Sequence, residues 1–177
     1  AGAIEGDVID NANLAFNRSD ATTFGGTISG SGTVRLLNGD LTLLGNNSYT
    51  GATDIAAGAT LRLGNGGAAG SLVGPVLNDG TLAFNRSDDA GFAGAISGSG
   101  TLRQLGTGKT ELTGDSSAFS GKTFVEKGTL AVNGHLGGTV DVLASGRLQG
   151  TGTVGSTIVR GTIAPGNSIG TLNVAGD

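Results

Sequence analysis

Short stretches of alternating apolar and polar residues recur along the whole chain. In each stretch two apolar side chains stand two residues apart with a small or polar residue between them; examples are Leu61/Leu63, Leu82/Phe84, Leu130/Val132, Val140/Val142 and Leu172/Val174. A period of two places one set of side chains on a buried face and the other in water, which is typical of β-strands. A Gly-Thr pair commonly opens these stretches and predicts a turn before each strand. No apolar set keeps a helical period over three turns without a Gly, so the pattern predicts an all-β chain with very little helix.

A long internal repeat organises most of the chain. Residues 14–20 return as 82–88 and residues 24–35 return as 92–103, and with a small drift in the offset Tyr49 corresponds to Phe119. Short strands with brief turns fit an antiparallel sandwich or a β-solenoid. The solenoid is favoured because like residues such as Ile28 and Ile96 recur in series, as when each coil lies on the previous one. With three sides to a coil, one turn takes roughly 20 to 25 residues, so the offset corresponds to about three coils and the chain to about seven or eight.

Composition narrows the class of protein without defining a function. The chain has 36 Gly, no Trp and 14% charged residues, so a core of large aromatic side chains is excluded. The net charge of -4 and the scattered Lys and Arg provide no basic stripe for nucleic acid. No apolar run approaches the roughly 18 residues of a membrane helix, so we expect no membrane insertion by this chain. Because it has no Met and begins with Ala1, we expect it to be a piece of a longer protein.

The C-terminal third contains the residues most specific to a family. Residues 133–142, 146–155 and 161–174, the last with the run Ala-Pro-Gly-Asn-Ser-Ile-Gly-Thr-Leu, are similar to the C-terminal passenger region of classical autotransporters of the type V secretion pathway, of the pertactin-like type. Two earlier stretches, residues 47–61 and 117–130, resemble the short repeat associated with those passengers. Together these stretches cover most of residues 38–177.

The resemblance implies a right-handed parallel β-helix (β-solenoid) that is secreted across the outer membrane to the bacterial cell surface or the extracellular space. It implies the translocator β-barrel of the same precursor as a partner, with other passenger chains or a host surface as further partners. It also implies two regions. Residues 1–124 would be stalk coils with the repeat units 14–64 and 82–134, and residues 125–177 would be an autochaperone-like region that nucleates folding.

The polar repeat Asn-Arg-Ser-Asp is the sharpest candidate for a ligand site. Its two copies contribute Asn17, Arg18 and Asp20, and then Asn85, Arg86 and Asp88. In a functional interpretation the arginines and aspartates form a tandem ligand-binding edge on one side of the rod. In the structural interpretation, which we favour, Asn takes a positive-φ corner and Asp accepts backbone N–H bonds, so the same turn is built twice, about three coils apart.

Motifs of known catalytic chemistry occur only as fragments. Residues 166–170 match the nucleophile elbow G-x-S-x-G, but a strand follows and the sole histidine, His135, belongs to another turn. Residues 114–117 resemble a lipase nucleophile block without its other blocks, and residues 150–155 match G-x-G-x-x-G without a following helix. The acidic residues are dispersed; a weak cation site is conceivable only at an N-terminal group, which comprises Glu5, Asp7 and Asp10. We therefore predict no catalytic, cofactor-binding or metal-binding residues.

These observations favour a non-enzymatic β-helical stalk with a segment that promotes folding and secretion. An adhesin or self-association surface, active in cell aggregation, biofilm or host attachment, is the first alternative because long β-helices can associate through ladders of Thr and Asn. A polysaccharide-cleaving β-helix enzyme is the second alternative. Such an enzyme needs acidic and basic residues converging on one groove, and the sequence indicates no such convergence.

Overall fold

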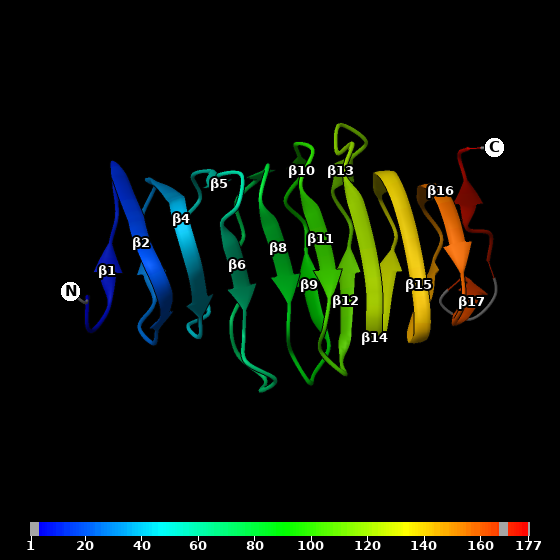
Figure 1. The fold of residues 1–177 in the computed structure, drawn as a ribbon, viewed down its shortest axis with the longest axis horizontal. Coiled ribbons are helices and arrows are strands. Elements are labelled where there is room, and N and C mark those ends of the chain that lie inside the picture. Colours follow the sequence, from blue (N-terminus) through cyan, green and yellow to red (C-terminus); the bar gives the residue numbers. More distant parts are fainter. Residues whose placement is uncertain (1–3, 167–169, 177) are drawn as a thin grey trace.

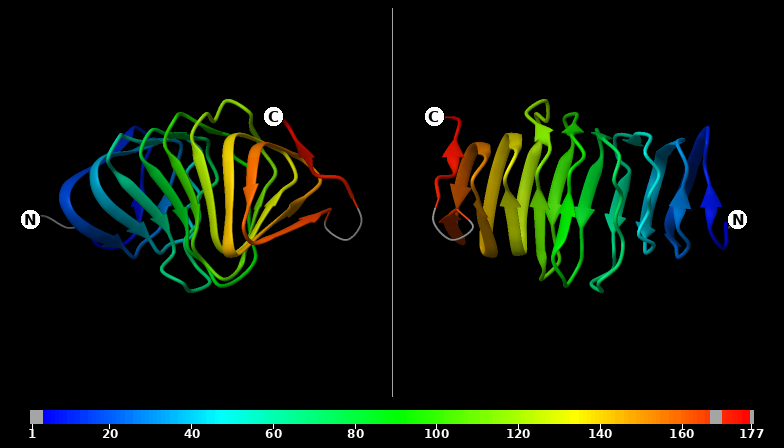
Figure 2. Two further views of the ribbon diagram at one scale, coloured as in Figure 1. Left: turned by 45° about the vertical axis from the view of Figure 1, so that its right-hand side comes forward. Right: turned by 180° about the vertical axis from the view of Figure 1, so that it is seen from behind.

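The chain forms a rod of stacked β-coils. The computed structural model describes residues 4–166 and 170–176 and contains a parallel β-solenoid of about eight turns in that range. The coils follow one another along the long axis, with the N- and C-terminal parts at opposite ends (Figure 1), and two further views show the same elongated shape (Figure 2). The described ranges contain no helix. The all-β class, the parallel solenoid and the expected number of coils are thereby confirmed.

Most strands are short, and the long ones are β2 and β4 near the N-terminal end and β14 and β15 nearer the C-terminal end. The first nine are β1 Val8–Ile9, β2 Asn13–Phe24, β3 Ile28–Ser29, β4 Thr33–Leu43, β5 Thr53–Ile55, β6 Thr60–Leu63, β7 Val76–Asn78, β8 Thr81–Phe84 and β9 Ala90–Phe92. The others are β10 Ile96–Ser97, β11 Thr101–Gln104, β12 Lys109–Leu112, β13 Asp115–Ser116, β14 Lys122–Val132, β15 His135–Gly150, β16 Thr153–Val159, β17 Thr162–Pro165 and β18 Asn173–Val174.

Each coil has three faces, which the chain visits in the order A, B and C. Face A contains β5, β7, β10, β13, β18 and the beginnings of β2, β4, β15 and β16. Face B contains β6, β8, β11, the ends of β2, β4 and β16, the beginning of β14 and the middle of β15. Face C contains β1, β3, β9, β12, β17 and the ends of β14 and β15. The paired strands are parallel, and on face C the pair of β1 and β3 forms a two-stranded sheet separate from the other strands.

The sequence repeat advances by one face for every copy. Each strand pairing advances by one coil, and three such steps from Leu14 lead to Val76. The repeat partner of Leu14 is Leu82, which lies six residues further along the chain. Leu82 instead lies three coils beyond Thr22, on face B, whereas Leu14 lies on face A. Ile28 on face C and Ile96 on face A are likewise not in one column. The sequence predicted that the repeat offset equals three coils and that like residues stack. This prediction is wrong, because the offset exceeds three coils by one face, so like residues lie on different faces.

Columns of apolar side chains fill the interior of the solenoid. On face B the inward positions of six successive coils have at most 1% of their surface exposed; they are Leu41, Leu61, Leu82, Leu102, Thr123 and Val140. Most of the residues that alternate with them along the strands are partly exposed, as the alternation predicts, whereas Ala83 in β8 is also buried. Burial of apolar surface at about 25 cal/mol per Å² between neighbouring coils stabilises the rod without a spherical core.

Two ladders of glycines run along the corners of the solenoid. The ladder between faces A and B comprises Gly80, Gly100, Gly121, Gly138 and Gly155, and the ladder between faces C and A comprises Gly32, Gly51, Gly74, Gly94, Gly114, Gly134 and Gly152. A β-carbon at Gly121 would lie 1.9 Å from the carbonyl oxygen of Gly100, and a β-carbon at Gly51 would lie 2.0 Å from that of Gly32. Real side chains do not tolerate such distances. At both of these glycines the backbone of the preceding coil lies where a side chain would be, so only glycine fits.

One buried polar pair occurs in the first copy of the repeat and not in the second. The hydroxyl of Tyr49 lies 2.6 Å from Oγ1 of Thr53 inside the solenoid. The second copy has Phe119 in place of the tyrosine, and Oγ1 of Thr123 is buried with no hydrogen-bond partner among the described residues. A hydroxyl buried without a partner costs free energy, so this position is less well satisfied than its counterpart.

Burial of Tyr49 predicts a loss of stability in alkali. Desolvation raises the pKa of Tyr49 to about 12, above the value near 10 of an unfolded chain. The folded state therefore retains the phenol proton to a higher pH than the unfolded state does. The stabilising difference is complete below pH 10 and is lost as the pH rises toward 12, by up to about 2.5 kcal/mol. Urea unfolding from pH 8 to pH 11.5 measures this loss, and the phenolate absorbance reports one group because the chain has 1 Tyr and no Trp.

Tyr49→Phe is the matched control because it removes the phenol and keeps the ring. The variant should lose the part of the alkaline destabilisation that comes from this group, while lysine titration affects both proteins equally. Phenolate absorbance that rises near pH 10 while the wild-type chain is still folded would contradict the expected burial.

Candidate functional site

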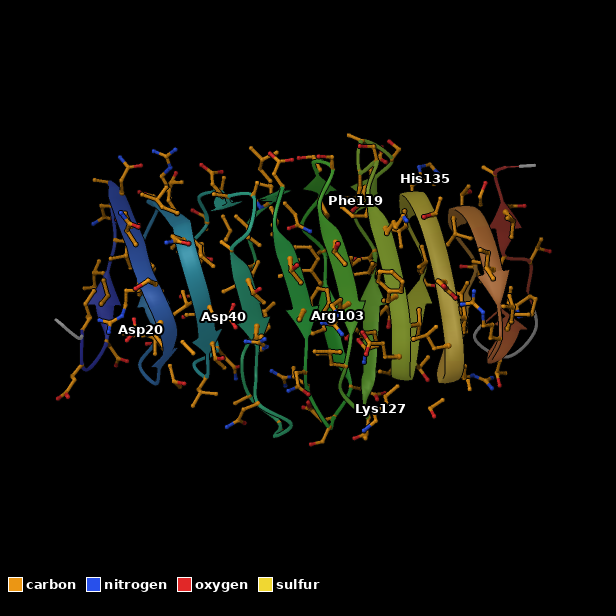
Figure 3. The ribbon with its side chains drawn as sticks, viewed as in Figure 1. Asp20, Asp40, Arg103, Phe119, Lys127 and His135 are labelled. Carbon is orange, nitrogen blue, oxygen red and sulfur yellow. The ribbon has the colours of Figure 1, made fainter. Side chains whose placement is uncertain are left out.

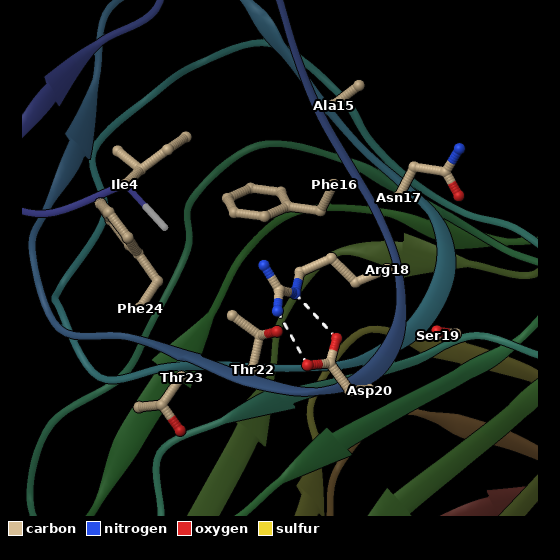
Figure 4. A pocket seen from close by; sticks show the side chains of 10 residues that line it. All are labelled: Ile4, Ala15, Phe16, Asn17, Arg18, Ser19, Asp20, Thr22, Thr23 and Phe24. Atoms are coloured by element: carbon tan, nitrogen blue, oxygen red, sulfur yellow. Dashed lines mark hydrogen bonds and ion pairs between the residues drawn. The ribbon is translucent and has the colours of Figure 1, made fainter. Parts of the chain in front are cut away.

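The first Asn-Arg-Ser-Asp corner lies at the N-terminal end of the rod, at the edge between faces A and B. Nε and Nη2 of Arg18 donate hydrogen bonds of 2.9 and 2.8 Å to the two carboxylate oxygens of Asp20. The side chains line a hollow of about 450 Å³ together with Phe16, Phe24 and Ile4 (Figure 4). Arg18 thus lies beside the end of the apolar interior and has its charge balanced by a neighbouring carboxylate.

The second corner contains the same ion pair in a more buried position. Nε and Nη2 of Arg86 donate bonds of 2.9 and 2.8 Å to the carboxylate of Asp88. The guanidinium also donates to the carbonyl oxygens of Ala68, at 2.7 Å, and Gly70, at 3.2 Å, and to Oδ1 of Asn46, at 3.2 Å. Arg86 therefore binds the loop that follows β6 on the preceding coil and holds it against the corner of residues 85–88.

The two corners do not form one ligand-binding edge. The first lies between faces A and B, whereas the second lies between faces B and C, because the repeat advances by one face. The described residues with positive φ are all glycines, so the proposed positive-φ role of Asn17 and Asn85 is wrong. β2 instead continues through its corner with shifts of strand register on either side of Asn17, which turns the chain without a left-handed residue.

The carboxylates of both corners are stabilised in their charged form. Hydrogen bonds from Arg18 hold the pKa of Asp20 below its ordinary value, and those from Arg86 do the same for Asp88. The same bond to Asp20 raises the pKa of Arg18. Each depressed carboxyl contributes stability that is present above its unfolded pKa near 4 and is lost as the pH falls through the folded value. In each corner the arginine and the aspartate therefore bind each other, which stabilises the turn.

His135 and the Gly-Asp-Ser-Ser segment lie close together without forming a catalytic triad. Nδ1 of His135 is 3.4 Å from Oδ1 of Asp115, on the outside of the rod, where Figure 3 labels the histidine. Asp115 also accepts the backbone N–H of Ser117, and hydrogen bonds from Ser117 lower the pKa of Asp115. Serine and histidine thus converge on one carboxylate, whereas a nucleophile needs the serine to donate to the histidine.

The glycine motifs do not have the surroundings that their chemistry needs. Residues 150–155 join β15 to β16, so a strand follows where a nucleotide site needs a helix. In the segment 166–170, residues 167–169, with the serine of the nucleophile-elbow pattern, lie outside the described residues. The first and last glycines of that segment are part of the C-terminal turn of the rod.

Two of the N-terminal acidic residues bind backbone groups, Asp7 on the next coil and Asp10 on its own coil. Oδ1 of Asp7 accepts the N–H of Thr27 at 2.7 Å, which lowers the pKa of Asp7, and Oδ1 of Asp10 accepts the N–H of Ala12 at 3.0 Å. No group of three His, Cys, Asp or Glu residues in the described ranges is arranged to hold a metal ion. Nor does that part of the chain contain a helix long and apolar enough to span a membrane.

Ion pairs between neighbouring coils are the surface feature that sequence patterns missed. They link Arg35 to Asp54, Arg62 to Asp40, Arg103 to Glu126, Lys109 to Asp89 and Arg160 to Asp141. The partners are one coil apart, so the coil length is the signal that would have paired them. Exposed pairs of this kind contribute little to stability because water and salt screen them, and in each pair one basic side chain is matched by one acidic side chain.

Comparison with known proteins connects these coils to a defined repeat. The model of the passenger-associated-transport-repeat matches residues 27–63 and 102–132. Both matches fall in the duplicated coils of the solenoid. No solved structure matches the chain.

Two curated relatives are far longer than this chain. The chain is 42% identical over 132 residues to an adhesin, the BmaC autotransporter of Brucella suis biovar 1, a match that covers 63% of this chain and 4% of the relative. It is 38% identical over 112 residues to an extracellular serine protease of Serratia marcescens, which covers 59% of this chain and 11% of the relative. The passenger-associated repeats, the solenoid and these relatives identify the chain as part of the passenger region of a type V autotransporter, exported to the cell surface or the extracellular space.

Proposed function

We propose that this chain is a non-enzymatic stalk segment that also promotes folding and secretion of the passenger. The observation that carries the proposal is the mainly apolar interior, which continues from coil to coil while the polar corners close on themselves as ion pairs. A rod of this kind holds whatever is attached to it at a distance. The protease activity in the name of one relative need not extend to this chain, which spans 11% of that protein.

The folding role is assigned to residues 125–177, and the stalk role to residues 1–124. Two features of the C-terminal coils support this division. The coils become shorter toward this end, because Lys109 pairs with Thr129 one coil later, whereas Arg147 already pairs with Thr162. In addition, β15 passes through all three faces as one continuous strand of 16 residues. Short connections lower the entropic cost of closing each coil, which favours this region as the first to fold.

Matched core substitutions in the two regions test the folding role. Leu148 and Leu61 are both inward-facing and at most 1% exposed, each between residues of the neighbouring coils. Leu148→Ala and Leu61→Ala should reduce the free energy of unfolding by comparable amounts. If residues 125–177 nucleate folding, Leu148→Ala should slow refolding about tenfold, whereas Leu61→Ala should mainly accelerate unfolding. Stopped-flow fluorescence of Tyr49 and far-UV circular dichroism follow both rates.

The opposite pattern would contradict the assignment. If Leu61→Ala slows refolding as much as Leu148→Ala or more, folding does not begin in the C-terminal coils. Refolding rates that are unchanged in both variants would also remove the nucleation role, because a nucleus must contain some of the buried contacts.

The stalk requires partners outside this chain. We propose the translocator β-barrel of the same precursor as the first, since the relatives are autotransporters or secreted proteins. A second candidate function is an adhesive surface that binds host cells or other passengers, favoured by the word adhesin in the name of one relative. Attachment of beads coated with this chain to host cells would support that candidate, and inert beads would remove it.

A further inference from the structure

Three Asn-Gly dipeptides occur in the chain, and each has the local sequence that favours deamidation. In this reaction the backbone nitrogen of the glycine attacks Cγ of the asparagine, and the missing glycine side chain leaves room for the five-membered ring that forms. The dipeptides begin at Asn38, Asn65 and Asn133. All three share the same pair of residues, so the surrounding structure decides which of them reacts.

At Asn38 the attacking nitrogen lies beside its target. The N–H of Gly39 donates to Oδ1 of Asn38 at 2.9 Å, and Cγ is one covalent bond away from that oxygen. Asn38 is exposed in β4, at the corner between faces A and B, so water can reach the carboxamide and ammonia can leave. The geometry therefore brings the nucleophile, the electrophilic carbon and solvent together at one surface position.

The glycine nitrogens of the other two dipeptides are bound to neighbouring coils. The N–H of Gly66 donates to the carbonyl oxygen of Asn85 at 2.8 Å, and the N–H of Gly134 donates to that of Leu112 at 3.1 Å. Either nitrogen must leave a hydrogen bond between coils before it can attack the preceding asparagine. Such bonds lower the fraction of chains in a reactive arrangement.

The side chain of Asn133 is fixed as well. Its Nδ2 donates to Oε1 of Glu111 at 2.7 Å, and its Oδ1 accepts the backbone N–H of Thr151 at 3.1 Å. Attack at Cγ would turn the carboxamide out of both bonds. Of the three dipeptides, the one at Asn38 is therefore the one in which the hydrogen bond of the glycine nitrogen points at the carboxamide itself.

We propose that Asn38 is a site of spontaneous deamidation in the folded chain. The nitrogen of Gly39 loses its proton to solvent and forms a bond to Cγ of Asn38, and the carboxamide nitrogen leaves as ammonia. Water then opens the resulting succinimide at either carbonyl, which gives aspartate or isoaspartate at position 38. Overall, one water is consumed and one ammonia is released, and nothing is oxidised or reduced.

The modification alters the corner in charge and in backbone length. Either product adds one negative charge to a chain whose formal net charge is -4. Isoaspartate also lengthens the main chain by a methylene group at the residue that pairs with Asn17, where the register of β2 and β4 already shifts. An exported passenger is no longer renewed inside the cell, so modified chains accumulate with age.

Tryptic peptide mapping can follow the three dipeptides separately. Cleavage after lysine and arginine places them in residues 36–62, 63–86 and 128–147. The folded chain is incubated at mildly alkaline pH, and mass spectrometry measures the fraction of each peptide in which a carboxyl group has replaced the carboxamide. Fragmentation distinguishes Asn38 from the other asparagines of its peptide, and enzymatic methylation detects isoaspartate. A parallel sample unfolded in urea gives the rates without the fold.

In the folded chain Asn38 should deamidate about tenfold faster than Asn65 or Asn133, because each of the latter must first open a hydrogen bond between coils. In urea the three rates should be similar. Asn38→Gln should abolish the modification in residues 36–62, since glutamine has to form a larger ring. Asn65→Gln is the matched control on another exposed residue and should leave the rate at Asn38 unchanged; circular dichroism verifies the fold of both variants.

Equal rates at the three dipeptides of the folded chain would overturn the assignment, as would a faster reaction at Asn65 or Asn133. An Asn38 that stays intact in the folded chain but reacts in urea would show that the fold protects it. The proposal is independent of the stalk and folding roles, because it is measured as covalent change in chains that are already folded.

Discussion

Gly121→Ala should destabilise the solenoid by about 3 kcal/mol or more, although it adds a single methyl group. The added β-carbon would lie 1.9 Å from the carbonyl oxygen of Gly100 and 2.8 Å from the ring of Phe119. The carbonyl cannot move away freely, because it accepts the N–H of Lys122 at 3.2 Å. Relief therefore requires two neighbouring coils to separate, which disturbs the apolar columns on both sides of the corner.

Gly91→Ala is the matched control for this substitution. Gly91 lies in β9, has no neighbouring atom within 4 Å of an added β-carbon and does not have a positive φ. Alanine there should change the free energy of unfolding by less than about 1 kcal/mol, with a stabilising sign if the lower entropy of the unfolded chain dominates. Urea denaturation measures both values. Equal stabilities for the two variants would show that the glycine ladder does not hold the coils at this spacing.

Arg86→Ala should reduce the free energy of unfolding by about 3 kcal/mol. The side chain is 10% exposed and donates to Asp88, to the carbonyl oxygens of Ala68 and Gly70, and to Asn46. Each charge-assisted bond contributes about 1.5 to 3 kcal/mol where it is buried, and the truncation leaves acceptors without donors. The loop that precedes the corner would lose its attachment, so its amides should also exchange faster with solvent.

Arg18→Ala is the comparison that isolates the buried network from the ion pair itself. Arg18 forms the same two bonds to Asp20, but at the end of the rod, where the Asp20 carboxylate is largely exposed. Its removal should therefore reduce the stability clearly less than the removal of Arg86 does. The two losses are measured by urea denaturation under the same conditions. Equal losses would mean that the contacts of Arg86 to the preceding loop add nothing to the stability of the chain.

Much of the fold follows from local patterns that need no partner to be recognised. The alternation at Leu61 and Leu63 predicted a strand with one buried face, and both side chains are buried in β6. The Gly-rich corners predicted a turn every few residues, and the duplication predicted stacked units. Period and turn chemistry act within a few residues, so they are visible in the sequence alone.

The chemistry of individual sites was less predictable because identical residues have different neighbours. Arg18 and Arg86 have the same sequence context, yet only one has the loop of residues 64–71 placed against it by the preceding coil. Thr53 and Thr123 correspond in the repeat, but their pairing depends on whether the aromatic residue four positions earlier carries a hydroxyl. Such differences depend on the adjacent coil, whose position the local pattern does not specify.

The sequence by itself determined that this protein is a repetitive all-β chain that buries one face of each strand, and the serial recurrence of like residues favoured a solenoid over an antiparallel sandwich. Only the tertiary structure decided which residues meet along the axis. The repeat is not a whole number of coils, since three coils from Leu14 end at Val76 whereas the repeat ends at Leu82. The second copy therefore starts one face later, and this rotation separates the polar corners and aligns glycines from unrelated parts of the repeat into ladders.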